Sequence, residues 1–309
     1  MSYNFDVLIL GGGPAGMSAG VYCARNNLST AVLDMSILGG QPINYLELEN
    51  YIGFPIVNSS ELMEKFELHM DRFNVQKFPM HEIRCVDLLS DLKSVETDNG
   101  IFYAKTVIIA TGAKPKKLGV KGEEEFLGRG VSYCAICDGA FYKGKTVAVI
   151  GGGNSALEEA IYLTNFAEKV YVIHYKDVLK ADKVVQERVM QNQKIELILG
   201  KKVKEIRGDE TVKQLIFDDS ELDVDGVFVY IGMTPNASFV RGQLSQDESG
   251  FIVTDTLMQT SVDGVYAIGD VRNSPLRQVV TAASDGAIAG VYAAKYIEMN
   301  SNELAHNNH

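Results

Sequence analysis

Two glycine-rich turns constrain the fold of this chain more than any other feature of its sequence. The first spans residues 11–16 and follows the apolar residues 5–10, and the second spans residues 151–156 and follows the apolar residues 146–150. A helix-forming segment comes after each turn. The spacings GxGxxG and GxGxxA, placed between a buried strand and a helix, are typical of dinucleotide-binding units. The sequence therefore predicts an α/β protein with two Rossmann-like, three-layer dinucleotide-binding domains.

The glycines of the first turn have separate physical tasks. Gly11 permits the tight turn, Gly13 lets the backbone approach a pyrophosphate, and Gly16 lets the helix pack closely on the strand. The next predicted strand, residues 30–33, ends in Asp34, about where an acid should hold a ribose hydroxyl. A glycine-rich turn without a ligand is the alternative, and the agreement of strand, glycines and acid disfavours it.

A pair of cysteines lies between the two turns. Cys134 and Cys137 are two residues apart and are followed directly by Asp138. Such a pair can close a small, readily reduced disulfide, and the carboxylate can pass protons as thiols and disulfide interconvert. Half of a zinc site has the same spacing, but Cys23 and Cys85 are isolated and we expect them to be small core residues rather than ligands. We therefore expect no metal, and a flavoprotein that moves electrons between a flavin, a disulfide and a second donor.

Composition sets broader limits. The chain has 309 residues, of which 46% are hydrophobic, which is enough for two domains with large cores. We expect no membrane span, because no run of 18 apolar residues occurs, and no signal peptide, because the N-terminus lacks a basic segment. The four cysteines suggest a reducing cytoplasm. The net charge of −11 argues against nucleic acid as a partner.

Further motifs occur in a fixed order along the chain. Besides the two turns and the dithiol centre, they are residues 39–41 (GGQ), 49–55 (ENYIGFP), 110–113 (ATGA), 269–271 (GDV) and 277–283 (RQVVTAA). Taken together, their order and spacing resemble the low-molecular-weight thioredoxin reductases over nearly the whole chain. The resemblance implies a thioredoxin-disulfide reductase that carries FAD, acts on thioredoxin and forms a homodimer.

The resemblance also implies roles for individual residues. Cys137 matches the thiol that faces the flavin, Cys134 the thiol that attacks the partner disulfide, and Asp138 the acid that protonates the leaving thiolate. An ordinary turn acid is the alternative for Asp138. The positions expected to hold FAD are Gly11, Gly13, Pro14, Ala15, Gly16, Asp34, Gly40, Gln41, Asn50, Thr111, Gly112, Gly269, Asp270, Arg277, Gln278 and Val279. The positions expected to grip thioredoxin, or else to be a surface charge and two core aromatics, are Arg129, Phe141 and Tyr142.

The same resemblance predicts the domain order. Residues 1–116 and 244–309 are expected to form a discontinuous FAD-binding domain, and residues 117–243 a second nucleotide-fold domain that carries the dithiol. Two crossings between the domains would act as hinges. In the family, rotation about them brings the nicotinamide and the dithiol to the flavin in turn.

The electron donor is the point at which this chain departs from the family. Members that use NADPH clamp its 2′-phosphate with arginines, whereas this chain has Tyr175, Lys176 and Lys180 at those positions, and Asn154 in the turn. Lysine offers a point charge without a bidentate fork. The sequence therefore makes NADPH doubtful and favours the branch that takes electrons from reduced ferredoxin. NADPH bound through the lysines and a dithiol oxidase of the same fold stay open as alternatives, while the intact dithiol disfavours a binding protein without turnover.

Overall fold

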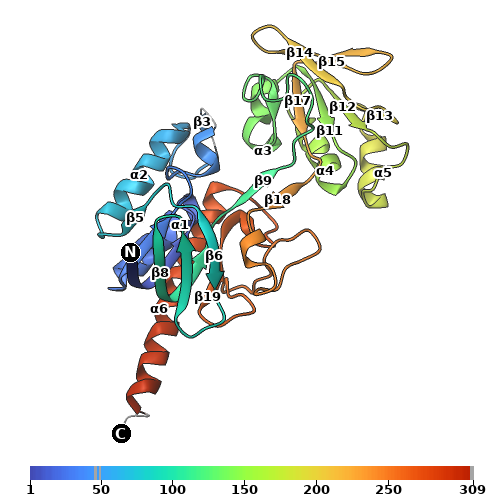
Figure 1. The fold of residues 1–309 in the computed structure, drawn as a ribbon. Helices are drawn as coiled ribbons and strands as arrows, with labels where there is room; N and C mark the ends of the chain where they lie inside the picture. The colour runs from blue at the N-terminus through green and yellow to red at the C-terminus, as the bar shows by residue number, and fades with distance from the viewer. Residues whose placement is uncertain (45–46, 49, 307–309) are drawn as a thin grey trace. The chain divides into compact units, whose positions relative to one another are not determined.

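The computed structural model describes residues 1–44, 47–48 and 50–306, and the chain divides into two compact units (Figure 1). One unit is formed by Met1–Lys114 with Thr234–His309, and the other by Pro115–Met233. The first crossing lies two residues before the predicted position at 116, but the second lies ten residues before the predicted position at 243. The second crossing lies earlier because Ala237 and Val240, which the prediction assigned to the second domain, are buried in the core of the first unit.

The first unit is built on a seven-stranded sheet with the order β5-β2-β1-β8-β7-β6, in which β19 also pairs with β8. The pairs among β5, β2, β1, β8 and β19 are parallel, and β8, β7 and β6 pair antiparallel. The strands are β1 (Ser2–Leu10), β2 (Thr30–Leu33), β5 (Gln76–Phe78), β6 (Ile83–Asp87), β7 (Lys93–Thr97), β8 (Gly100–Ile109) and β19 (Val265–Ala267). The short strands β3 (Glu47–Leu48) and β4 (Val57–Asn58) form a separate hairpin.

Three helices complete this unit: α1 (Pro14–Arg25), α2 (Ser59–Asp71) and α6 (Val279–His306). Helix α1 begins inside the glycine-rich turn, because Pro14 fits the first turn of a helix, where no amide donor is needed. Helix α6 lies against α1, and Gly286 permits this approach, since a Cβ atom there would lie 2.3 Å from the carbonyl oxygen of Ala15.

The central strand β1 is buried on both faces, which explains its continuous apolar run. Val7 and Ile9 belong to the core that includes residues of α1 and α6, whereas Leu8 and Leu10 belong to a second core that includes residues of β7 and β8. A parallel strand covered on both faces has no polar alternation. The sequence pattern therefore predicted this strand correctly.

The second unit holds a five-stranded parallel sheet with the order β10-β17-β11-β12-β13. Its strands are β10 (Val131–Ser132), β11 (Thr146–Ile150), β12 (Lys169–His174), β13 (Ile195–Leu199) and β17 (Gly226–Val229). Its helices are α3 (Ala135–Asp138), α4 (Asn154–Leu163) and α5 (Lys183–Gln191). A separate antiparallel sheet contains β14 (Glu205–Gly208), β15 (Val212–Ile216) and β16 (Glu221–Asp223). Both glycine-rich turns are thus followed by the predicted helices, and the three-layer α/β prediction is confirmed.

The two segments that connect the units pair with each other. They are β9 (Ala113–Pro115) and β18 (Met233–Pro235), which form a two-stranded ribbon. In the part of the chain that the structure describes, no helix has the length and apolar character needed to cross a bilayer.

Candidate redox and cofactor sites

One edge of the first sheet collects most of the residues predicted to hold FAD. Strands β1, β2 and β8 end level with one another, because Leu10 pairs with both Leu33 and Ile109. The glycine-rich turn, Asp34 and the segment 110–112 follow these strand ends directly, and Gly269 and Asp270 follow β19. Ligands of open α/β sheets bind at the carboxyl ends of the strands. The topology therefore brings together residues that are far apart in the sequence.

The backbone of the first turn packs so closely against neighbouring segments that glycine is required at two positions. Gly11 has φ 111°, and a Cβ atom there would lie 2.3 Å from the carbonyl oxygen of Ala110. A Cβ atom at Gly40 would lie 2.9 Å from the Cα atom of Gly13, so these two glycines face each other. Gly13 also starts α1 without a side-chain cap. The uncapped helix N-terminus can therefore receive a phosphate.

Asp34 is held beside this turn by hydrogen bonds. One carboxylate oxygen accepts from the amide of Gly12 at 2.7 Å, and the other accepts from the amide of Ser36 at 2.8 Å. The oxygen that accepts from the Ser36 amide also accepts from the Ser36 hydroxyl at 3.0 Å, whereas the oxygen that accepts from Gly12 keeps a second lone pair. Asp34 is thus fixed in orientation and can still accept a hydroxyl.

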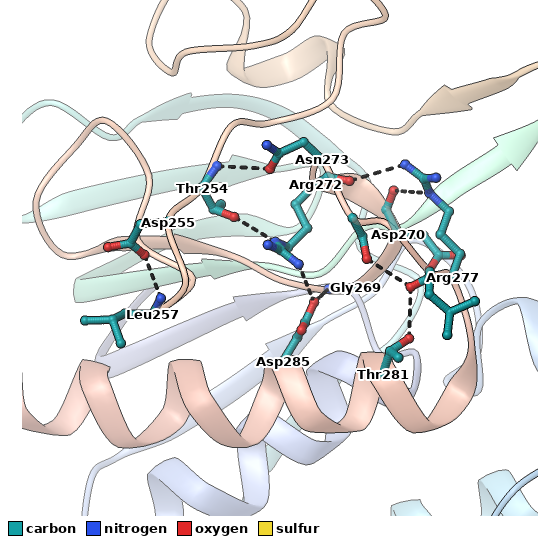
Figure 2. Close-up of polar contacts among 12 residues, drawn as sticks. Thr254, Asp255, Leu257, Gly269, Asp270, Arg272, Asn273, Arg277, Thr281 and Asp285 are labelled. Carbon is teal, nitrogen blue, oxygen red and sulfur yellow. Dashed lines mark hydrogen bonds and ion pairs between the residues drawn. The ribbon is translucent and has the colours of Figure 1, made fainter. Parts of the chain in front are cut away.

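A buried network holds the turn that carries Asp270 (Figure 2). Asp285 of α6 is 8% exposed, and its Oδ2 atom accepts from the amide of Gly269 at 3.0 Å and from Arg272 Nη1 at 3.3 Å. Arg272 Nε also donates to Thr254 Oγ1 at 2.7 Å. The backbone around Asp270 is therefore tied to α6 on one side and to the 254 loop on the other.

Burial raises the pKa of Asp270 to about 6, and the nearby Asp285 also raises it, while Arg277 lowers it. Among the described residues, no hydrogen bond reaches the Asp270 carboxylate. A carboxylate that is partly withdrawn from water gains from a hydroxyl donor, which replaces the lost hydration. Asp270 therefore fits a polyol chain such as that of FAD.

The remaining residues predicted to hold FAD make different contacts within the protein. Asn50 Nδ2 donates to Gln278 Oε1 at 3.0 Å, so these two residues meet across 228 positions of sequence. Arg277 contacts the segment that carries Asp270: its Nε donates to the carbonyl of Asp270 at 3.5 Å, and its guanidinium lies 4.3 Å from the ring centroid of Phe251. The others are Gln41, which donates to Ala113, Thr111, which donates to Asn236, Gly112, with φ 69°, and Val279, which begins α6.

The redox centre lies at the start of α3. Cys134 and Cys137 form a disulfide, and the amide of Cys137 donates to Cys134 Sγ at 3.2 Å. Ser132 Oγ donates to Asp138 Oδ2 at 2.6 Å and accepts from the amide of Cys134 at 3.0 Å. Burial raises the pKa of Asp138, and the Ser132 hydrogen bond lowers it. A carboxyl group that can hold a proton therefore lies next to a disulfide.

Comparisons with known proteins decide the family. A family model described as pyridine nucleotide-disulphide oxidoreductase matches residues 5–286. The Bacillus subtilis protein named thioredoxin reductase is 44% identical over 301 residues, with 95% of each chain covered. The chain belongs to the thioredoxin reductase family.

Solved structures agree with this membership. The Streptococcus pyogenes thioredoxin reductase is 44% identical with a TM-score of 0.91, covering 96% of this chain and 99% of that one. A ferredoxin-flavin thioredoxin reductase from Clostridium acetobutylicum is 32% identical with a TM-score of 0.54, covering 97% and 100%. The chain is thus an oxidoreductase with a redox-active Cys134–Cys137 pair, and membership of the thioredoxin reductase family implies FAD.

The two remaining cysteines differ from each other. Cys23 is buried in the first core, as predicted, and burial raises its pKa to about 12. The prediction for Cys85 was wrong, since it is exposed and donates to Glu96 Oε2 at 3.4 Å. Cys85 lies on β6, an edge strand, where Val86 faces the core and its neighbour faces outward.

The residues expected to grip thioredoxin have different environments. Phe141 is 48% exposed, which a core aromatic would not be. Tyr142 packs on Phe228, with ring centroids 5.2 Å apart. Arg129 is exposed and donates to the carbonyl of Glu125. Phe141 and Arg129 are therefore accessible, whereas Tyr142 is partly a core residue.

The second turn repeats the backbone of the first but has different side chains around it. His174 ends β12 and is 6% exposed, and its ring lies against Gly152. Its Nε2 atom has no hydrogen-bond partner in the described chain. Burial lowers the pKa of His174, and the positive charges of Lys180 and Lys176 lower it further, so both lysines lie near it. Asn154 Nδ2 donates to Asp182 Oδ2 at 2.8 Å.

Sequence reasoning missed three residues of these sites. Ser132 orients Asp138, Asp285 holds the Gly269 turn, and Tyr230 accepts from the amide of Ala135. Ser132 lies six residues from Asp138 in no motif used for the prediction, and the Asp285 and Tyr230 contacts join positions 16 and 95 residues apart, which local patterns do not reveal.

Proposed function

We propose that this protein is a thioredoxin-disulfide reductase that passes electrons from a donor through FAD and the Cys134–Cys137 dithiol to thioredoxin. The observation that carries the proposal is the disulfide at the start of α3 with Asp138 held beside it by Ser132. The thioredoxin reductase name of the relatives supports the choice of substrate. We expect the protein to work as a cytoplasmic homodimer.

The first unit would hold FAD. The helix N-terminus after Gly13 would face the pyrophosphate, Asp34 would accept a ribose hydroxyl, and Asp270 would accept from the polyol chain. Asn50 and Gln278, bonded to each other, would line the same site. Bound FAD supplies the two-electron chemistry that reduces the protein disulfide.

The dithiol then performs the exchange. Reduction of the Cys134–Cys137 bond takes two electrons and two protons and leaves two thiols. Cys134 attacks one sulfur of the thioredoxin disulfide as a thiolate, which forms a mixed disulfide and releases a thiolate. Asp138 gives that thiolate a proton, since burial favours its protonated form. Cys137 then attacks Cys134, which restores the protein disulfide and releases reduced thioredoxin.

Two candidate electron donors, reduced ferredoxin and NADPH, each have support. Reduced ferredoxin is favoured by the missing arginine fork and by the 32% identical ferredoxin-flavin enzyme. NADPH is supported by the second turn, where Lys176 and Lys180 lie near the buried, unpartnered Nε2 of His174 and neither lysine forms an ion pair within the described residues. We propose NADPH as the donor, and ferredoxin, which the sequence favours, as the second candidate, because Lys176 and Lys180 place positive charge beside the second turn that no ion pair neutralises within the described residues.

Anaerobic mixing tests the donor. Oxidised holoprotein is mixed separately with NADPH, NADH and reduced ferredoxin, and the loss of flavin absorbance is followed. Rapid, saturable bleaching by NADPH alone supports the proposal, whereas bleaching by ferredoxin alone replaces NADPH with the second candidate. Thioredoxin reduction with the successful donor tests the substrate, and rapid oxygen consumption with a dithiol substrate would instead indicate an oxidase.

A further inference from the structure

Tyr230 connects the second glycine-rich turn with the redox helix. It directly follows β17, and its amide donates to the carbonyl of Ile150 at 2.8 Å. Its own carbonyl oxygen lies so close to Gly151 that a Cβ atom there would be 2.3 Å away. The backbone of Tyr230 is therefore fixed against the turn.

The side chain of Tyr230 reaches the start of α3. Its hydroxyl oxygen accepts a hydrogen bond from the amide of Ala135 at 2.5 Å. Ala135 is 1% exposed, so bulk water does not satisfy this amide. A buried amide without an acceptor destabilises the fold, because it has lost its hydrogen bond to water. The Tyr230 hydroxyl thus removes a penalty at the first residue of a four-residue helix.

Two different groups satisfy the amides of this helix start. Cys134 is the N-cap residue, and its Sγ atom accepts from the amide of Cys137, the third helical residue. An N-cap side chain reaches the second or third amide and not the first. The Ala135 amide therefore needs a separate acceptor, which Tyr230 supplies.

We propose that Tyr230 is a positioning residue of the redox centre: by holding the Ala135 amide it keeps the Cys137 amide directed at Cys134 Sγ. In the reduced protein this amide would donate to a Cys134 thiolate, and a hydrogen bond to the charged form of a thiol lowers its pKa. The proposal rests on the redox role of Cys134 and Cys137. It does not depend on the identity of the donor or of the substrate.

Thiol alkylation tests the proposal. Dithiothreitol-reduced holoprotein is treated with iodoacetamide across pH 5–10, and Cys134 modification is measured by peptide mass spectrometry, which separates it from Cys137 and Cys85. In Tyr230→Phe the alkylation midpoint of Cys134 should move up by about 0.5–1 pH unit, which is roughly a three- to tenfold loss of thiolate near neutral pH. Tyr171→Phe, on β12 of the same sheet, is the control and should match the wild type.

Hydrogen exchange gives a second measurement that needs no chemistry at the thiols. The peptide covering residues 133–138 should exchange faster in oxidised Tyr230→Phe than in the wild type or Tyr171→Phe. An unchanged midpoint together with unchanged exchange would overturn the proposal. A changed midpoint in a protein that fails to reduce thioredoxin would leave the role of Tyr230 intact and reject the proposed substrate.

Discussion

The two glycine-rich turns have a similar backbone conformation at their first glycine. Gly11 and Gly151 both have positive φ, and at both positions a Cβ atom would lie 2.3 Å from a carbonyl oxygen, that of Ala110 in one unit and that of Tyr230 in the other. Each turn follows a strand that pairs in parallel on both sides and starts a helix that has no side-chain cap. The requirement for glycine is thus the same steric one in both units.

The side chains at the end of the next strand differ between the two units. Asp34 follows β2 and accepts from the amide after Gly11, whereas His174 ends β12 and has Lys176 and Lys180 near it. One turn therefore has a negative charge at the place where the other has positive charges. If both turns bind dinucleotides as proposed, the shared backbone would hold the pyrophosphate, and the strand-end side chains would select the nucleotide: a ribose hydroxyl for an acid, a phosphate for cations.

The largest effect on activity should come from replacing the redox cysteines, Cys134 and Cys137, which lie in the second unit. Cys134→Ser and Cys137→Ser should each lose at least about 10³-fold of disulfide reductase activity, because the two thiols act as one unit. Reduced Cys134→Ser should keep a thiolate beside the flavin and show a broad long-wavelength absorbance band, and reduced Cys137→Ser should not. Full activity in both variants would refute the assignment.

Next in size is the loss of the proton donor. Asp138→Asn should reduce turnover about 10²-fold, the lower range for a general acid. Wild-type turnover should fall as pH rises through the raised pKa of Asp138, because only the protonated carboxyl can donate. Ser132→Ala removes the hydrogen bond that lowers this pKa, so its alkaline limb should move to higher pH. A pH–rate profile that is identical in the wild type and Asp138→Asn would exclude this role.

A pair of variants can break the comparison between the strand ends. Asp34→Ala should weaken FAD binding by about 1.5–3 kcal/mol, the typical worth of a charged hydrogen bond, or roughly 10- to 150-fold in Kd. It should leave the KM for NADPH unchanged. Lys180→Ala should do the reverse, with a raised KM and unchanged FAD content. FAD titration of the apoprotein measures the Kd for FAD, and steady-state kinetics measure the KM for NADPH. If Asp34→Ala raised the KM, or Lys180→Ala weakened FAD binding, the two sites would not be separate.

A smaller effect concerns stability at the first site. The pKa of Asp270 is raised to about 6 by burial, so ionisation destabilises the folded apoprotein as pH rises from 3.8 through 6. Asp270→Asn should therefore stabilise the apoprotein by about 1–2 kcal/mol at pH 8 and by little at pH 4. It should also weaken FAD binding. Thermal unfolding at both pH values checks this, and a lower Tm at pH 8 would contradict the sign.

The smallest expected effect is on the KM for NADPH, after arginine is introduced at the second turn. Replacing Tyr175, Lys176 and Lys180 with arginine should lower the KM for NADPH by roughly five- to tenfold, since a guanidinium can bind the phosphate with two parallel hydrogen bonds. NADH should not benefit. No change with NADPH would place the limitation elsewhere, for example at the Asn154–Asp182 pair.

Much of the fold followed from local sequence. The strands at Thr30–Leu33 and Thr146–Ile150 have the predicted bounds, and both turns and the cysteine pair lie where the motifs placed them. Such features depend on glycine conformations and on apolar runs of a few residues, which the sequence displays directly. Of the residues predicted to hold FAD, Asp34 accepts from the amide of Gly12, and Asn50 donates to Gln278.

Only the tertiary structure decided which distant residues complete the sites. Tyr230 meets Ala135 across 95 positions, and Asn50 meets Gln278 across 228, because strand order and helix packing set these distances rather than sequence spacing. The same applies to the second crossing at Met233, which depends on where Ala237 and Val240 are buried. The motifs in the sequence determined the chemistry available to this protein, and long-range packing determined which side chains hold that chemistry in place.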